Sequence, residues 1–220
     1  MKTVVLGSEQ DGYNDLFADY GPVINASPYE YLKIDFDLLC FIGGNDLHPA
    51  FYGHKTHPTT YASLELDYAC HSWYLRAKHL RVPCVGICKG AQQLAVFNGG
   101  ALYQNVDNHT KEHLVKPILP EGHPQFKVTS SHHQMIDWST VTNVQLLVDT
   151  DPSICDNRII YSLSKRKFVN VKGSHIVEPE VLWFHKTRDL AVQYHPEWMD
   201  KESYGWKYFQ WLIKEYINVK

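Results

Sequence analysis

The feature that most constrains this chain is a cysteine with one glycine two residues before it and another two residues after it. The segment reads Gly86-Ile87-Cys88-Lys89-Gly90. The apolar run 83–87 predicts a buried strand, and residues 89–98 predict a short helix that ends at a glycine pair. A turn that passes directly from strand into helix leaves no room for side chains at the two flanking positions. The sequence therefore predicts a sharp elbow with Cys88 at its tip.

The predicted position of Cys88 suits a nucleophile. The N-terminus of a helix stabilises a thiolate, and the strained backbone of an elbow exposes its central side chain above the sheet. The alternative is a buried structural cysteine in a glycine-containing turn. Cys40 and Cys84 lie in apolar runs and lack both glycines, so we expect them to be core residues. The role of Cys88 therefore depends on partner residues elsewhere in the chain.

The remaining pattern alternates strands and helices in the first half and is richer in strands in the second. Residues 3–6 and 37–42 predict buried strands, and a helix is predicted to begin after Ser63. One face of that helix would carry Leu64, Tyr68, His71 and Leu75. Further strands are predicted at 126–129, 144–148, 158–163, 181–185 and 190–194, before an amphipathic helix over 201–216. We expect one α/β domain over residues 1–220, with a central mixed, mostly parallel sheet flanked by helices.

The composition excludes several classes of protein. Of the 220 residues, 44% are hydrophobic and 20% are charged, as in ordinary soluble domains. The formal net charge of -3 gives no strong positive field for nucleic acid. We see neither a secretory signal nor the roughly 20 apolar residues of a membrane span, and five scattered cysteines argue against a disulfide framework. We therefore expect a cytoplasmic protein that binds neither nucleic acid nor a membrane.

A histidine and a glutamate follow the predicted strand 190–194 as His195-Pro196-Glu197. Side chains at i and i+2 of an extended chain point to the same side, and Pro196 restricts His195 to extended backbone. Glu197 could then accept a hydrogen bond from His195 and fix its tautomer, as a base that serves a thiol nucleophile requires. Tyr194 and Trp198 flank this segment; lining a pocket is the alternative for them, and packing is their expected role.

Backbone amides near the elbow could stabilise an oxyanion during acyl transfer. The amide of Lys89 directly follows the nucleophile. Gly43 and Gly44 follow the buried strand 37–42, and glycines allow backbone N–H groups to approach a ligand closely. An ordinary tight turn is the alternative for this glycine pair.

Taken together, these motifs resemble those of class I glutamine amidotransferases. Their core motif GxCxGxQ is matched by Gly86, Cys88, Gly90 and Gln92, and their closing motif HPE by residues 195–197. Within that superfamily the chain most resembles the gamma-glutamyl hydrolase type, which includes hydrolases of gamma-glutamyl-GABA. The motif GGxDxxPxxY of those proteins fits residues 43–52, and a stretch like SxHHQ fits residues 130–134.

The resemblance implies a flavodoxin-like amidotransferase fold with Cys88, His195 and Glu197 as the catalytic triad. It also implies that Gly43, Gly44 and Lys89 form the oxyanion hole through their backbones. The residues that it assigns to the glutamyl group are Gln92, Ser131 and His132. No metal and no organic cofactor is implied. Cys70 stands where the hydrolases usually have an acidic residue, and Lys89 where they commonly have arginine.

The predicted reaction is cysteine-dependent hydrolysis of a small-molecule gamma-glutamyl amide through a gamma-glutamyl thioester. It releases glutamate together with ammonia or an amine. The alternative is a glutaminase subunit that delivers ammonia to a separate synthase, because this chain carries neither a GxxxxGK[ST] nor a GxGxxG motif. The identity of the amine, the presence of a synthase partner and the choice between monomer and homodimer stay open.

Two further classes of protein fit the residues less well. A metal-binding protein would use histidines near residues 109–133, but no helix is evident around His109 and His113, and adjacent side chains at His132 and His133 diverge. We therefore expect solvated or pocket-lining histidines there, including His123. A catalytically inactive binding module typically lacks a triad member, and all three members are present here.

Overall fold

The central element of the computed structural model is a nine-stranded mixed sheet. The structure describes residues 1–7, 12–30, 33–119, 121–150, 153–172 and 176–217. In spatial order the strands are β2 (Val23–Ala26), β1 (Thr3–Leu6), β3 (Leu38–Phe41), β4 (Cys84–Ile87), β14 (Asp189–Val192), β13 (Pro179–Phe184), β10 (Val144–Thr150), β7 (His113–Pro117) and β8 (Phe126–Val128). Pairing is parallel from β2 to β14 and antiparallel from β14 to β8.

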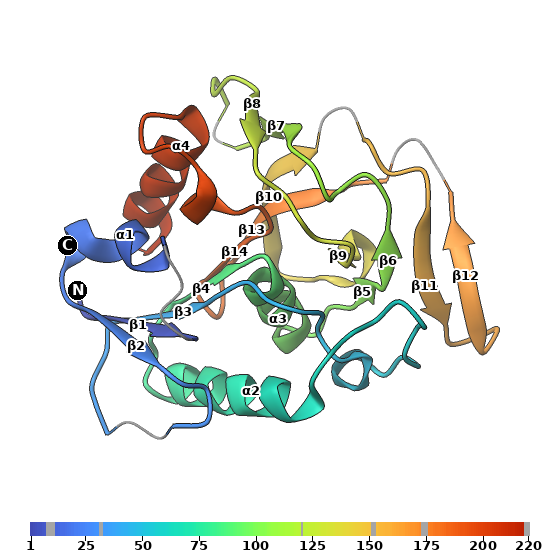
Figure 1. Cartoon of the computed structure of the whole chain (residues 1–220), viewed down its shortest axis with the longest axis horizontal. Coiled ribbons are helices and arrows are strands. Elements are labelled where there is room, and N and C mark those ends of the chain that lie inside the picture. The colour runs from blue at the N-terminus through green and yellow to red at the C-terminus, as the bar shows by residue number, and fades with distance from the viewer. Residues whose placement is uncertain (8–11, 31–32, 120, 151–152, 173–175, 218–220) are drawn as a thin grey trace.

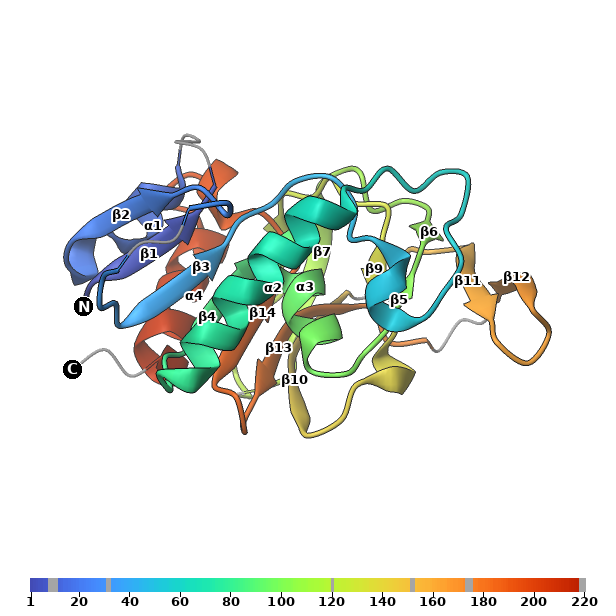
Figure 2. The same ribbon diagram turned by 90° about the horizontal axis from the view of Figure 1, so that it is seen from below.

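Helices cover both faces of the sheet (Figure 1 and Figure 2). One face packs against α2 (Leu64–His79) and α3 (Lys89–Phe97), and the other against α1 (Tyr13–Phe17) and α4 (Tyr204–Leu212). Single turns of 3₁₀-helix occupy Ala18–Tyr20, Pro49–Tyr52, Trp138–Thr140 and Pro196–Trp198, and a π-helical turn, Ile213–Ile217, extends α4. The result is a three-layer α/β/α arrangement, so the predicted fold class is confirmed.

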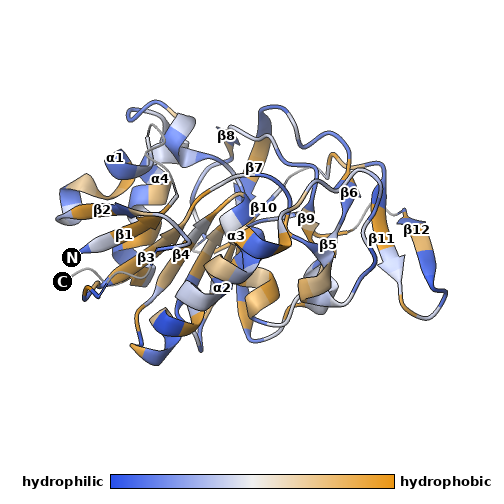
Figure 3. Cartoon of the chain, turned by 60° about the horizontal axis from the view of Figure 1, so that its bottom comes forward, coloured by the Kyte–Doolittle hydropathy of each residue, from blue (hydrophilic) through white to orange (hydrophobic). Residues whose placement is uncertain are grey.

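The alternation of side chains along β3 explains the two layers of core. Leu38 and Cys40 belong to the cluster on the α1 and α4 side, whereas Leu39 and Phe41 belong to the cluster on the α2 and α3 side. All four are at most 1% exposed. A strand covered on both faces reads as a continuous apolar run, and the strands at the centre of the sheet are accordingly hydrophobic along their length (Figure 3).

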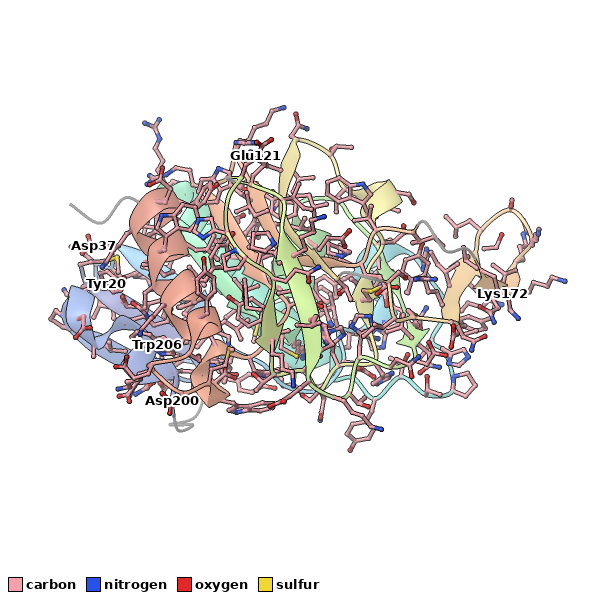
Figure 4. The ribbon with its side chains drawn as sticks, turned by 90° about the horizontal axis from the view of Figure 1, so that it is seen from above. Tyr20, Asp37, Glu121, Lys172, Asp200 and Trp206 are labelled. Atoms are coloured by element: carbon pink, nitrogen blue, oxygen red, sulfur yellow. The ribbon has the colours of Figure 1, made fainter. Side chains whose placement is uncertain are left out.

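Two small sheets lie on the side of the molecule away from β1 and β2 (Figure 1). One has the order β12 (Lys167–Val171), β11 (Arg158–Ser162), β6 (Asn105–Val106), and the other pairs β5 (Leu102–Tyr103) with β9 (Met135–Ile136). Lys172, directly after β12, lies at the opposite end of the molecule from Tyr20 and Asp37 (Figure 4). Of these strands, the sequence predicted the one at β11, and the family resemblance implies a strand after the glycine pair, where β5 lies.

The sequence predicted α2 correctly but not the face that it buries. Ser63 caps the helix by accepting a hydrogen bond from the amide of Leu66. However, Leu64, Tyr68 and Leu75 are exposed, and the buried residues are Asp67, Cys70, Trp73, Tyr74 and Ala77. The helix buries a mixture of aromatic, small and charged groups, so apolar periodicity alone identified the wrong side.

The C-terminal helix begins later than predicted, and its second half is a π-helical turn rather than regular α-helix. α4 begins at Tyr204, after an N-cap at Ser203, and the regular helix ends at Leu212.

All five cysteines are free and buried, with Cys40 and Cys84 fully inaccessible, as expected for core residues. Within the described ranges, none of the helices combines the length and the apolar character needed to cross a membrane.

The elbow between β4 and α3 has the close packing that its glycines predict. A Cβ atom on Gly86 would lie 2.3 Å from the carbonyl oxygen of Gly90, and one on Gly90 would lie 2.1 Å from the carbonyl oxygen of Phe41. Backbone atoms cannot retreat from such contacts as a flexible side chain can. Gly90 thereby allows the first turn of α3 to rest directly on β3.

We expect Gly90→Ala to destabilise the protein by at least about 1–3 kcal/mol, the usual range for overpacking a tight core. The measurement is urea denaturation followed by circular dichroism. Gly44→Ala is the matched control, because a Cβ there would meet only the Lys89 side chain, at an ordinary 3.7 Å. Equal stability of the two variants would contradict the packing argument.

Candidate active site

Three neighbouring parallel strands carry the predicted site residues at their carboxyl ends. Gly43 follows β3, Cys88 follows β4 and His195 follows β14, and these strands are adjacent in the sheet. In α/β sheets ligands bind at this edge. Side chains that are more than one hundred residues apart in sequence are therefore brought together by strand order alone.

Cys88 has a backbone conformation that few non-glycine residues adopt. Its φ and ψ are 52° and -108°, it occupies the N-cap position of α3, and its side chain is buried. Its amide donates to the carbonyl of Val192 on β14, at 2.9 Å. Strain of this kind persists only where the surroundings enforce it, which here means the glycine contacts of the elbow on both sides of Cys88.

His195 and Glu197 form a buried pair. Nδ1 of His195 lies 2.6 Å from Oε1 of Glu197, and the Glu197 side chain is fully buried. The amide of His195 donates to the carbonyl of Thr129, and the Thr129 hydroxyl donates back to the carbonyl of His195. The end of β8 therefore holds the histidine backbone while Glu197 fixes the orientation of its ring.

The surroundings of His195 favour its charged form. Burial lowers the pKa of this imidazole, but hydrogen bonds and charges from Cys88 and Glu197 outweigh burial and raise the pKa to about 9. The thiol of Cys88 faces the ring as one of those partners. The ring of His195 therefore stands beside Cys88 as a base stands beside a cysteine nucleophile.

Two side chains complete the surroundings of the His195 ring, and neither role was predicted. Trp198 stacks face to face on the imidazole, with ring centroids 3.7 Å apart and planes 6° apart, and its own side chain is 55% exposed. The hydroxyl of Ser131 lies 3.2 Å from Nε2 of His195. The sequence offered one hint for Trp198, its place three residues after His195 in the 3₁₀ turn. Tyr194, in contrast, is fully buried, as expected.

Tyr13 occupies a position that the sequence did not indicate. Its hydroxyl accepts a hydrogen bond from the amide of Gly43, at 2.9 Å. Burial, and then the charge and hydrogen bonding of Glu197, raise the pKa of this phenol well above its ordinary value. The amide of Gly43, a predicted oxyanion donor, is therefore paired with Tyr13 in this structure. Nothing in the short helix α1 marks this tyrosine in the sequence.

A cavity of about 160 Å³ opens beside the cysteine. The predicted residues Gly44, Cys88, Gln92, Ser131 and His132 all contribute to its lining. A larger cavity of about 530 Å³ lies next to it and shares Gly44, Asn45 and Tyr61 with it. The structure thus brings together the predicted nucleophile, one predicted oxyanion glycine and all three predicted substrate residues.

The three predicted substrate residues are also engaged with protein groups. The Gln92 side-chain amide donates to the carbonyl of Gln134, at 2.9 Å, and Nδ1 of His132 lies 2.8 Å from the same carbonyl. Ser131 approaches His195, as described above. These contacts hold segment 131–134 against α3, so Gln92 supports one wall of the cavity in addition to lining it.

A buried ion pair supports the residue that follows the nucleophile. Nζ of Lys89 lies 2.8 Å from Oδ1 of Asp67, with side-chain exposures of 6% and 0%. The same carboxylate accepts hydrogen bonds from the amide of His48 and the side chain of Gln93. This ion pair anchors the start of α3 to α2.

Comparison with known families agrees with this geometry. A family model described as Peptidase C26 matches residues 24–197, which include the elbow and all three strand-end segments. The chain belongs to the Peptidase C26 family. Its membership establishes a glutamine amidotransferase-like enzyme, and the resemblance to class I glutamine amidotransferases is thereby confirmed at the level of the superfamily.

Individual relatives are distant. PB2B2.05 of Schizosaccharomyces pombe, which carries the name of a glutamine amidotransferase, is 28% identical over 187 residues, covering 81% of this chain and 69% of that protein. Protein NtpR of Enterococcus hirae is 30% identical over 115 residues, covering 52% of this chain and 46% of that protein. The chain thus spans about two thirds of the first relative and less than half of the second.

Solved structures share the fold at low sequence identity. A Thermoplasma acidophilum protein that carries the name of a GMP synthase component superposes with a TM-score of 0.62 at 16% identity, covering 100% of this chain and 93% of that one. A glutamine amidotransferase from Thermotoga maritima gives a TM-score of 0.60 at 13% identity, covering 96% and 80%. These similarities support the flavodoxin-like amidotransferase fold.

The surroundings of His195 generate a pH prediction. Its pKa in the folded protein lies above the ordinary value of 6.5, so protonated His195 stabilises the fold fully below about pH 6.5, and this contribution is lost as the pH rises through 9. We expect NMR titration to give a pKa near 9 for His195 and lower values in Cys88→Ala and in Glu197→Gln. A value in Cys88→Ala equal to that of the unaltered protein would contradict the pairing.

The Lys89–Asp67 pair generates a stability prediction. We expect Asp67→Asn to cost about 3–5 kcal/mol in the free energy of unfolding, because it leaves a buried ammonium without a counter-charge. The double variant Asp67→Asn/Lys89→Met should recover much of this loss, since it removes the unpaired charge and keeps an acceptor for His48. The exposed pair Lys207–Glu202 is the control, and Glu202→Gln should cost less than about 1 kcal/mol.

Proposed function

We propose that this protein hydrolyses a gamma-glutamyl amide bond through a thioester on Cys88. The observation that carries the proposal is the buried chain of contacts from Cys88 to His195 to Glu197 beside a cavity of about 160 Å³. Nucleophile, base and orienting carboxylate are the three parts that acyl transfer by cysteine requires. A cavity of this size suits a small polar acyl group such as glutamyl.

In the proposed first step, the Cys88 thiolate attacks the gamma-carbonyl carbon of the substrate. A carbon–sulfur bond forms, and the carbonyl oxygen becomes an oxyanion. His195, as the imidazolium, then gives its Nε2 proton to the leaving nitrogen while the carbon–nitrogen bond breaks, which releases ammonia or an amine. Glu197 keeps Nδ1 protonated throughout, so that Nε2 is the nitrogen that exchanges protons.

In the second step, His195 accepts a proton from water, and the resulting hydroxide adds to the thioester carbon. Collapse of this intermediate breaks the carbon–sulfur bond and restores the thiolate–imidazolium pair. The product leaves with a protonated γ-carboxyl group, which releases its proton to solvent and becomes glutamate. We assign the oxyanion to the backbone amides of Lys89 and Gly44. Gly43 would contribute only once its amide is released from Tyr13.

The neighbouring cavity of about 530 Å³ favours a conjugate over glutamine itself. It adjoins the cysteine cavity at Gly44, Asn45 and Tyr61, so an amine substituent larger than ammonia can be accommodated there. A protein that only delivered ammonia to a synthase would need a narrow passage at this place. We therefore place free-standing hydrolysis of a conjugate before ammonia delivery.

The decisive experiment measures glutamate release from L-glutamine and from a panel of gamma-glutamyl amines and gamma-glutamyl peptides. We expect the highest kcat/KM for one conjugate, no turnover in Cys88→Ala, and a loss of about 10²–10⁴-fold in kcat for Glu197→Gln. Cys84→Ala is the matched cysteine control and should keep the substrate preference, because Cys84 is a core residue of β4.

Two other outcomes would overturn parts of this proposal. Slow glutamine turnover without activity on any conjugate would overturn the hydrolase proposal in favour of a glutaminase that serves a separate synthase. Substantial turnover in Cys88→Ala would overturn the proposed nucleophile. Mass spectrometry of the intact protein, quenched during turnover, should detect a glutamyl adduct that is absent from Cys88→Ala.

A further inference from the structure

A second group of chemically active side chains lies buried behind the wall of the cavity. One ring nitrogen of His109, one ring nitrogen of His132 and one oxygen of Glu180 lie within 4.8 Å of one another, and Nδ1 of His109 is 3.8 Å from Oε1 of Glu180. The three residues are 0%, 4% and 1% exposed. They come from the segment before β7, the segment before β9 and strand β13, so the fold assembles this cluster from three separate parts of the chain.

Each member of the cluster has an unsatisfied polar atom. Nδ1 of His109, Nε2 of His132 and Oε2 of Glu180 are buried and make no hydrogen bond within the described residues. Buried polar atoms are almost always paired, and each unpaired one costs about 1–3 kcal/mol. Unsatisfied atoms on all three residues of one buried cluster indicate a missing partner that can accept a lone pair from each residue.

The hydrogen bonds of His132 leave the lone pair on the atom that faces the cluster. Its Nδ1 lies 2.8 Å from the carbonyl oxygen of Gln134. A carbonyl can only accept, so Nδ1 carries the proton and Nε2 carries the lone pair. A histidine whose one nitrogen donates to a backbone carbonyl is the usual form of a metal-ligating histidine.

The same reasoning applies to His109 in the opposite orientation. Its Nε2 lies 3.3 Å from Oε2 of Glu178. Glu178 also forms a buried ion pair with the guanidinium of Arg158, as an ionised carboxylate does. The ionised carboxylate accepts the Nε2 proton, which leaves the lone pair on Nδ1.

Hydrogen bonds to Oε1 hold Glu180 beside the two histidines, and the same oxygen lies 3.8 Å from Nδ1 of His109. Oε1 of Glu180 lies 3.0 Å from Nε2 of His113 and accepts from the hydroxyl of Thr150, at 3.3 Å. Oε2 has no partner within the described residues. His113 and Thr150 thus orient this carboxylate, as the outer-shell groups of a metal site do.

We propose that His109, His132 and Glu180 bind a divalent transition-metal ion, with Zn²⁺ as the reference metal. Two imidazole nitrogens and one carboxylate oxygen form a donor set that zinc takes in proteins, with water as the fourth ligand. The separations are somewhat wider than in a metal-loaded site, so ligation draws the three atoms together. A dication also offsets negative charge from the two buried glutamates, whose other basic partners include Arg158 and His113.

The location of this site indicates a structural effect on the active site. His132 directly follows Ser131, whose hydroxyl contacts His195, and both residues line the cysteine cavity. A metal bound to His132 would fix segment 130–134 to β13 and thereby hold Ser131 in place. The sequence predicted that His132 and His133 diverge, and they do: His133 pairs with Asp46 instead. It did not predict that His109 approaches His132 and that Glu180 joins them.

The test measures Zn²⁺ binding by equilibrium dialysis of tag-free protein that has first been treated with a chelator. The parent protein carries Cys88→Ala, because the thiolate beside His195 is itself a zinc ligand and would confuse the count. We expect one Zn²⁺ per chain, at least about tenfold weaker binding in Glu180→Gln and in His109→Gln, and unchanged binding in the matched control His123→Gln.

Two further readouts guard against variants that fail to fold. Zn²⁺ should raise the thermal unfolding midpoint of the parent and of His123→Gln, but not that of a folded Glu180→Gln protein. Co²⁺ in the same site should show visible d–d absorption without the charge-transfer band of a thiolate ligand. These readouts do not depend on the proposed hydrolase activity.

Less than one tenth of an equivalent of Zn²⁺ at saturation, on the order of the background of a chelated protein, would overturn the proposal. So would equal binding by the parent and a folded Glu180→Gln protein, or a thiolate band with Co²⁺. In chelator-treated protein that retains Cys88, unchanged glutamate release would leave the metal site standing and would overturn only its positioning of Ser131.

Discussion

Direct backbone contact between the start of α3 and strands β3 and β4 is the constraint on which the site depends. Gly86 and Gly90 permit this contact, and the backbone of Cys88 adopts a positive φ because the chain must turn within one residue. Once α3 rests on β3, the end of β3 lies beside the nucleophile, and the parallel neighbour β14 brings His195 to its other side. The sheet order then determines which residues can react together.

Three buried ion pairs hold the segments that form the active site and the wall behind it. Lys89 pairs with Asp67 of α2, His195 with Glu197, and Arg158 with Glu178. A buried pair contributes little to net stability compared with apolar packing, but losing one partner is costly. Such pairs therefore favour a single arrangement of the surrounding loops, which suits a site whose amides and side chains must stay aligned.

The elbow, the pair His195–Glu197 and the sheet class could be predicted because each rests on local rules. Glycines at two fixed offsets, a proline between two polar residues and short apolar runs act within a few residues of sequence. Tyr13, Thr129 and the burial face of α2 could not be predicted in this way. Their partners, Gly43, His195 and Lys89, lie between about 20 and 70 residues away, and only the strand order determines these meetings.

The histidines show the same limit. From their spacing alone, His109 and His113 would need to lie on a helix to bind one metal ion together, and no helix forms there. In the structure His113 begins β7, His109 precedes it, and both reach glutamates of the strand-rich half, Glu178 and Glu180. A cluster built across a sheet leaves no periodic trace in the sequence, because each of its members comes from a different segment.

The half-exposed indole of Trp198 gives the protein an optical property. It stacks on the imidazole of His195 at van der Waals distance, and a protonated imidazole in contact with an indole quenches its fluorescence. The emission of this one tryptophan therefore follows the charge on the neighbouring ring, while its solvent-facing side remains open to soluble quenchers. Proton movements at His195 are thus coupled to a light signal that requires no label.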